Sequence, residues 1–217
     1  MNNRLDQTRQ QLYLPHDLLW GLAPEHLPVN APAWAVEALQ VEPPVVVRRA
    51  PSPAGTIAVG VRGKTRDQRF ACWMPLSAVT RCVQPEQLIT PALAEAHRDW
   101  PLFKALAQLA VPLNQIGVRW GITGSLGFQL ASGIEVTHPA SDLDLLVRTP
   151  RPISRAQATS WLELIAQAPA AVDVQLQCPA GAVALREWAT SSSQVLLKTQ
   201  TQPLLVDDPW AVECAVA

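Results

Sequence analysis

Apolar and polar residues alternate most clearly in the second half of the chain, and their spacing predicts strands and helices in turn. Val118 to Ile122 is a short apolar run that leads into Gly124, and Leu126 to Ala131 has the spacing of a short helix. Residues 172–177 read V-D-V-Q-L-Q, the strict alternation that is typical of a strand. The succession of strands and helices from residue 118 onward predicts a mixed α/β sheet.

Several helices and strands are expected around this sheet. Leucines recur every three or four residues from Leu102 to Leu113, which predicts a core helix beginning near Pro101, and Pro112 should shorten or kink its end. The pair Thr90-Pro91 has the form of another helix start. The remaining expected elements are a helix over 155–168 capped by Ser154, a helix over 181–189, and strands over 194–198 and 203–206.

The first part of the chain has a different pattern. Short apolar runs at 45–49, 56–61 and 70–74 predict strands, and residues 31–39 predict one short amphipathic helix. We therefore expect a smaller, β-containing N-terminal domain over 1–88 and a larger domain over 89–217. The predicted fold class is α+β, a mixed sheet with flanking helices plus this N-terminal domain.

Two aspartates, Asp142 and Asp144, lie in a predicted strand at 142–147. Because side chains alternate across a strand, both carboxylates share one face, while Leu143 and Leu145 point toward the core. Placing two like charges side by side is costly unless a cation lies between them. A hard divalent ion with oxygen ligands, Mg²⁺ or Mn²⁺, meets that need. The alternative is that the aspartates form a solvated strand end.

Composition narrows the class of protein. The chain has 217 residues, of which 48% are hydrophobic and 16% charged, so it is long and apolar enough for a substantial core. Its net charge of -1 argues against bulk electrostatic binding to nucleic acid. The polar N-terminus and the lack of a long uncharged apolar run predict neither a signal peptide nor a membrane span. Four cysteines without metal-ligand spacing fit reduced thiols in a cytoplasmic protein.

The near-zero net charge conceals a local basic cluster. Residues 48–81 contain six arginines and one lysine against a single aspartate, and the positive charge is densest at Arg62, Lys64, Arg66 and Arg69. A guanidinium presents a fork that matches phosphate oxygens, so this segment is a candidate phosphate-binding surface. The alternative is a solvated charged loop. Lys198 is a second candidate contact, or else a surface lysine at a strand end.

Three common nucleotide or hydrolase motifs are absent. The glycines near Gly124 do not spell G-x-G-x-x-G, and no G-x-x-x-x-G-K-[ST] occurs. Ser125 lacks the G-x-S-x-G elbow because residue 123 is threonine. His138 precedes the acidic strand, where it either braces the loop or faces a substrate.

The Gly124-Ser125 turn, the short helix after it and the Asp142-x-Asp144 strand together resemble the nucleotidyltransferase superfamily typified by polymerase beta. The resemblance implies that the Gly-Ser turn holds a triphosphate and that the acidic pair binds metal. Backbone amides at a helix start are suited to phosphate. A third carboxylate usually comes from a later strand in that superfamily, and Asp173 matches this position.

A closer resemblance covers most of the chain. The chain is similar to the malonate decarboxylase holo-acyl-carrier-protein synthases, also called phosphoribosyl-dephospho-CoA transferases. The similarity rests on five stretches: H-D-L-L-W at 16–20, G-V-R-G-x-x-R-x-Q-R-F at 60–70, G-S-L-G-F-Q, S-D-L-D-L-L and V-L-L-K-T near 195. This resemblance implies transfer of 2'-(5''-triphosphoribosyl)-3'-dephospho-CoA to a serine of the acyl carrier protein subunit, with release of diphosphate. The alternatives are a nucleotidyltransferase that uses an ordinary nucleotide, and a non-catalytic nucleotide-binding protein with the same fold.

Overall fold

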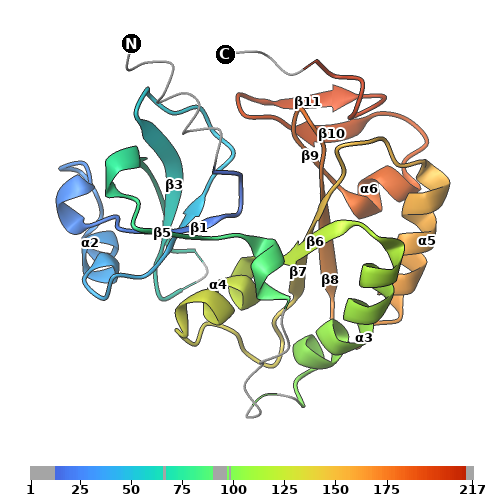
Figure 1. Cartoon of the computed structure of the whole chain (residues 1–217), viewed down its shortest axis with the longest axis horizontal. Helices are drawn as coiled ribbons and strands as arrows, with labels where there is room; N and C mark the ends of the chain where they lie inside the picture. The colour runs from blue at the N-terminus through green and yellow to red at the C-terminus, as the bar shows by residue number, and fades with distance from the viewer. Residues whose placement is uncertain (1–12, 66, 90–96, 98, 214–217) are drawn as a thin grey trace. The chain divides into compact units, whose positions relative to one another are not determined.

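The computed structural model describes residues 13–65, 67–89, 97 and 99–213, and Figure 1 shows its helices and strands. The chain divides into two compact units, Met1–Gln84 with Ala131–Ile134, and Pro85–Leu130 with Glu135–Ala217. Each unit has its own sheet and its own buried core. The α+β class expected from the sequence is confirmed.

The first unit is built on a five-stranded antiparallel sheet with the order β4-β3-β2-β1-β5. Its long hairpin alternates as a half-buried sheet should, since Ile57, Val59 and Val61 all point into the core. The elements are β1 (Leu18–Trp20), α2 (Ala33–Leu39), β2 (Val45–Val47), β3 (Thr56–Arg62), β4 (Arg69–Pro75) and β5 (Arg81–Val83), with short 3-10 turns at Pro24–His26 and Leu76–Ala78.

The second unit is built on a six-stranded mixed sheet with the order β11-β10-β9-β8-β7-β6. Only β7 and β8 are parallel, and helix α5 makes the crossover between them. The strands are β6 (Arg119–Ile122), β7 (Leu143–Arg148), β8 (Val172–Gln177), β9 (Ala182–Ala184), β10 (Val195–Lys198) and β11 (Pro203–Val206). The helices are α3 (Pro101–Ile116), α4 (Gly124–Ser132), α5 (Arg155–Ala166) and α6 (Leu185–Thr190), with a 3-10 turn at Pro85–Leu88.

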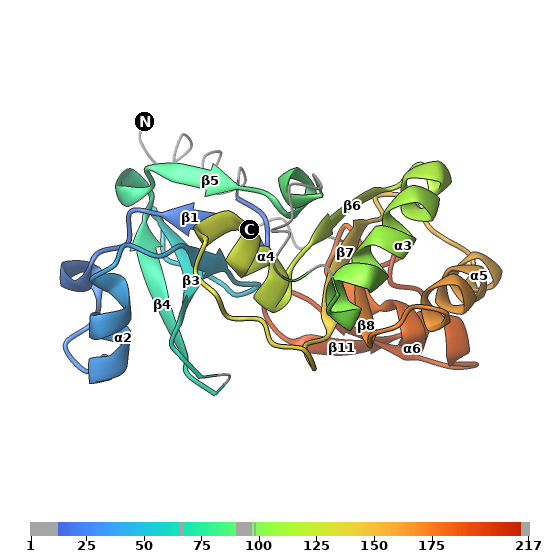
Figure 2. The same cartoon turned by 90° about the horizontal axis from the view of Figure 1, so that it is seen from below.

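The core of the second unit lies between this sheet and three helices. Figures 1 and 2 show α3, α5 and α6 on the same side of β6, β7 and β8. Leu143 and Leu145 of β7 are buried in the same cluster as Leu109 of α3 and Trp161 of α5. The opposite face of β7 is thereby left to carry the alternate side chains, beginning with Asp144.

The structure corrects two expectations about helices. Pro112 does not shorten α3, because it lies inside the helix, which continues to Ile116 and is followed by Gly117 in a left-handed conformation. Residues 181–189 do not form one helix, because Ala182–Ala184 pair as β9 with β8 and β10 before α6 begins. The helix start expected at Thr90-Pro91 lies outside the described residues.

The described cysteines, Cys72, Cys82 and Cys178, are thiols that form no disulfide. Burial raises the pKa of Cys72 to about 11, against a smaller opposing effect of Arg48. Burial also raises the pKa of Cys82 to about 11, and the nearby charge of Asp17 adds to the shift. Neither Cys72 nor Cys82 is therefore primed as a thiolate nucleophile.

Candidate active site

Three carboxylates meet where the neighbouring strands β7 and β8 begin, and we call this cluster of Asp142, Asp144 and Asp173 the acidic edge. Asp144 is the second residue of β7 and lies directly beside Asp173 of β8 in the parallel register. Asp142 immediately precedes β7 rather than lying within it, because the strand begins at Leu143. Even so, each of the three residues offers an oxygen, and these oxygens all lie within 4.8 Å of one another. The structure thus brings together the three aspartates that the sequence singled out.

The geometry of this acidic edge fits a divalent cation. Two oxygens bound to one Mg²⁺ at about 2.1 Å can be at most about 4.2 Å apart, so a small side-chain adjustment from the observed spacing suffices. Asp142 and Asp144 are half-buried and Asp173 is exposed, so the site is open to solvent on the β8 side. Three negative charges this close repel one another unless a cation compensates them.

A tight turn places the start of α4 against the acidic edge. Strand β6 ends at Ile122 opposite Leu145, and the Thr123 backbone N–H donates to the Asp144 carbonyl at 2.9 Å. Gly124 follows with φ 62°, a left-handed conformation that favours glycine. A Cβ on residue 124 would lie only 1.8 Å from Asp144 Oδ2. Glycine is therefore required here for backbone conformation and for the close approach of the carboxylate.

The same turn opens a helix of nine residues, and the backbone N–H groups at a helix start point outward along the helix axis. Such groups, together with the helix dipole, favour anions such as phosphate. Gly124 is exposed and Ser125 is half-buried, so this end of α4 is accessible from solvent. The acidic edge and an anion-favouring helix start are thus direct neighbours within one unit.

The basic residues lie in the first unit, on its β3–β4 hairpin. Arg62 and Arg69 are directly opposite each other in the antiparallel register. The Arg69 guanidinium donates to the carbonyl oxygens of Thr65 at 3.4 Å and Gln68 at 3.2 Å, which holds it over the hairpin turn. Arg66 lies outside the described residues.

Lys198 does not lie with the three carboxylates. It ends β10 and is level with Ala182 of β9, which in turn pairs with Gln177 at the last position of β8. Asp173 is near the opposite end of β8. Lys198 is exposed, as the alternative of a strand-end surface lysine expects. His138 is exposed in the loop before Asp142.

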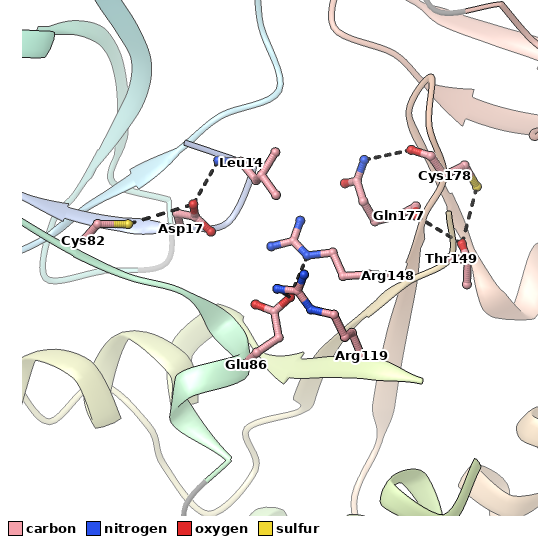
Figure 3. A network of polar contacts seen from close by, with 9 residues as sticks. All are labelled: Leu14, Asp17, Cys82, Glu86, Arg119, Arg148, Thr149, Gln177 and Cys178. Atoms are coloured by element: carbon pink, nitrogen blue, oxygen red, sulfur yellow. Dashed lines mark hydrogen bonds and ion pairs between the residues drawn. The ribbon is translucent and has the colours of Figure 1, made fainter. Parts of the chain in front are cut away.

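Sequence reasoning missed a charged network at the far end of β6 and β7. Figure 3 shows Glu86 with two arginines from these neighbouring strands. Its Oε1 accepts from Arg148 Nε at 2.8 Å and from Arg119 Nη2 at 3.2 Å. Burial alone would raise the pKa of Glu86, but the hydrogen bond and charge of Arg148, with help from Arg119, bring that pKa below its ordinary value. The cross-strand pair Arg119 and Arg148 could not be recognised without the register.

Figure 3 also shows polar contacts in each unit that involve residues in strands or just beyond their ends. The Leu14 backbone N–H donates to Asp17 Oδ2 at 2.9 Å, so Asp17 closes the turn before β1. After β7, the Thr149 hydroxyl donates to the Gln177 carbonyl at 3.1 Å. These contacts stabilise the ends of strands and take no part in the acidic edge.

Two models of known protein families together match almost the whole chain. The family model described as the phosphoribosyl-dephospho-CoA transferase MdcG C-terminal domain matches residues 87–209, and the one described as its N-terminal domain matches residues 14–85. No solved structure matches the chain. Among the described residues, no helix has the length and apolar character needed to cross a bilayer.

Several relatives carry the name phosphoribosyl-dephospho-CoA transferase. One from Pseudomonas aeruginosa is 54% identical over 200 residues, which covers 91% of this chain and 94% of the relative. One from Pseudomonas putida is 51% identical over 202 residues, covering 93% and 97%, respectively. One from Azotobacter vinelandii is 52% identical over 200 residues, covering 90% and 93%. The matched domains and relatives define an enzyme class, the transferases. Within that class, the chain belongs to the phosphoribosyl-dephospho-CoA transferase family.

Proposed function

We propose that the protein transfers 2'-(5''-triphosphoribosyl)-3'-dephospho-CoA to a serine of the malonate decarboxylase acyl carrier protein and releases diphosphate. The observation that carries this proposal is the cluster of Asp142, Asp144 and Asp173 oxygens within 4.8 Å, beside the start of α4. Family membership supports the dephospho-CoA donor.

The reaction forms one bond and breaks one. The serine oxygen bonds to the phosphorus nearest the ribose, the bond from that phosphorus to the diphosphate oxygen breaks, and a phosphodiester results. Asp142, Asp144 and Asp173 would hold Mg²⁺ or Mn²⁺, which when bound neutralises the triphosphate and stabilises the leaving diphosphate. Asp173 is the exposed member of the three, so we assign it the additional role of accepting the serine proton.

The donor is long and strongly anionic, and we propose two contact regions for it. Backbone N–H groups at Gly124 and Ser125 would receive phosphate oxygens at the start of α4. Arg62, Arg66 and Arg69 would meet further phosphates or an acidic carrier protein, because a guanidinium binds phosphate through paired hydrogen bonds. Lys198 stays a weaker candidate, since it lies level with the far end of β8 from Asp173. The cysteines among the described residues are free thiols, which supports a cytoplasmic location for this transfer reaction.

The decisive test measures the mass of the carrier protein by mass spectrometry after incubation with purified enzyme, donor and Mg²⁺. We expect a mass gain that corresponds to the donor less diphosphate, located on one serine, and no gain with Asp144→Asn or without a divalent cation. A gain from ATP or CTP in place of the donor would favour an ordinary nucleotidyltransferase. Donor binding with no gain on any carrier would favour the non-catalytic alternative and contradict our proposal.

A further inference from the structure

Gln129 is one of several side chains that hold the loop leading from α4 to Asp142, and it makes the most contacts with the backbone of that loop. Gln129 lies on α4, and its Oε1 accepts three hydrogen bonds: from the Val136 backbone N–H at 3.0 Å, the Thr137 backbone N–H at 2.9 Å and the Thr137 hydroxyl at 2.7 Å. All three partners donate, so only an oxygen can serve at this position. The contact is half-buried, and an acceptor missing here would leave two backbone donors unsatisfied.

From this anchor a second closed turn continues to the metal-binding candidates. The His138 backbone N–H donates to Ser141 Oγ at 3.0 Å, and the Ser141 backbone N–H returns to the His138 carbonyl at 2.9 Å. Ser141 is buried and immediately precedes Asp142. The position of Asp142 therefore depends on a loop that has no regular secondary structure of its own and is fixed by side-chain contacts.

Helix α4 thus reaches both members of the acidic pair. Its first residue, Gly124, lies against the Asp144 carboxylate, and Gln129, five residues later, holds the loop that carries Asp142. We propose that Gln129 is a positioning residue that sets where Asp142 stands relative to Asp144, and so tunes divalent-cation binding. This inference rests on the metal site of the proposed function. Groups that hydrogen-bond directly to a metal ligand are typically worth 10- to 100-fold in metal affinity, and we expect the smaller value here because Gln129 acts through the loop.

Three variants test the proposal. Gln129→Met keeps the length of the side chain but removes the acceptor, whereas Gln129→Glu keeps an acceptor oxygen at the same distance along the chain. Gln108→Met is the matched control, because it makes the same change on α3, where the amide donates to the exposed Gln167 carbonyl at 3.3 Å. Each is titrated with Mn²⁺ alone by calorimetry, and amide hydrogen exchange is followed at Val136 and Thr137.

We expect Gln129→Met to bind Mn²⁺ about 10-fold more weakly than the wild type and to exchange both amides faster. The Mn²⁺ affinities of Gln129→Glu and Gln108→Met should stay within about threefold of the wild-type value. Melting temperatures report folding independently of the metal. Wild-type Mn²⁺ affinity in folded Gln129→Met, or a loss in Gln129→Glu as large as in Gln129→Met, would overturn the positioning role alone. Absence of Mn²⁺ binding by the wild type itself would overturn the metal site and this inference with it.

Discussion

Replacing Gly124 by alanine is the sharpest test of how the acidic edge is built. A Cβ at this position would lie 1.8 Å from Asp144 Oδ2 and 2.6 Å from its Cγ, whereas real Cβ contacts essentially never fall under 3.0 Å. The carboxylate must therefore move by about 1 Å or rotate away, since the backbone of Thr123 is hydrogen-bonded to the carbonyl of the same aspartate. A misplacement of about 1 Å at a reacting centre can lower a rate about 100-fold.

A second effect acts on stability rather than on the reaction. Residue 124 has φ 62°, and an L-residue with a Cβ loses about 1–2 kcal/mol in a left-handed conformation. Gly117 separates the two effects, because it has φ 74° and a Cβ placed there would have nothing within 4 Å. Gly117→Ala should therefore show the conformational cost alone, as a drop of several degrees in melting temperature for a chain of this size.

The assay follows the mass of the carrier protein over time, with melting curves and Mn²⁺ titrations for both variants. We expect Gly124→Ala to transfer the donor about 100-fold more slowly than Gly117→Ala, at a similar melting temperature, and to bind Mn²⁺ more weakly. Equal transfer rates and equal Mn²⁺ affinities in the two variants would contradict this prediction, because the steric clash with Asp144 would then have no consequence.

Three further predictions concern the charged residues. Asp142→Asn and Asp144→Asn should each reduce transfer more than about 100-fold, as measured by the mass of the carrier protein. Each should keep or raise the melting temperature without metal, because a repulsive charge is removed. Near-normal transfer at saturating Mg²⁺ would contradict the metal role. Glu86→Gln should lower the free energy of unfolding by about 3 kcal/mol near neutral pH, because it removes the negative charge that is paired with the buried Arg148 guanidinium. Since folding lowers the pKa of Glu86, its contribution to stability is present above the unfolded pKa and is lost as the pH falls through the folded pKa. The stabilities of wild type and variant should therefore converge progressively in acid, once the pH falls below the ordinary glutamate pKa. The double variant Arg66→Ala, Arg69→Ala should have a donor KM about tenfold higher, with little change in kcat, and this KM should depend less steeply on salt concentration, as measured by initial rates. An unchanged KM in the folded double variant would support the alternative that these arginines belong to a solvated loop.

Two signals that act over a few residues were interpreted correctly from the sequence. Ser154 was expected to cap a helix, and its hydroxyl accepts from the Gln157 backbone N–H at 3.1 Å, with α5 beginning at Arg155. The spacing of Asp142 and Asp144 was enough to place both carboxylates together, although the strand itself begins between them. In each case the determining contact lies within three residues of the signal.

Contacts between distant strands were not visible in the same way. Residues 181–189 are rich in alanine and favour a helix locally, but Ala182 pairs with both Gln177 and Lys198, so sheet pairing overrides helix propensity for three residues. The register that sets Asp144 beside Asp173 is likewise a property of the assembled sheet. The pattern predicted that Asp173 faces the polar side of its strand, but its alignment with Asp144 required the structure.

The G-S-L-G-F-Q stretch at 124–129 also shapes the acidic edge, in addition to the phosphate contact proposed for its backbone. It suggests a phosphate-binding turn, yet three of its positions have contacts that concern packing around the acidic edge. Gly124 admits the Asp144 carboxylate, a Cβ at Gly127 would lie 2.6 Å from the Ile122 carbonyl, and Gln129 holds the loop before Asp142. Loss of activity on changing these residues would therefore report the placement of carboxylates and not phosphate contact. The proposed phosphate site uses backbone N–H groups, which side-chain substitution cannot remove, so it has to be tested from the donor: an analogue with fewer phosphates should lose affinity for the wild type and for Asp144→Asn alike.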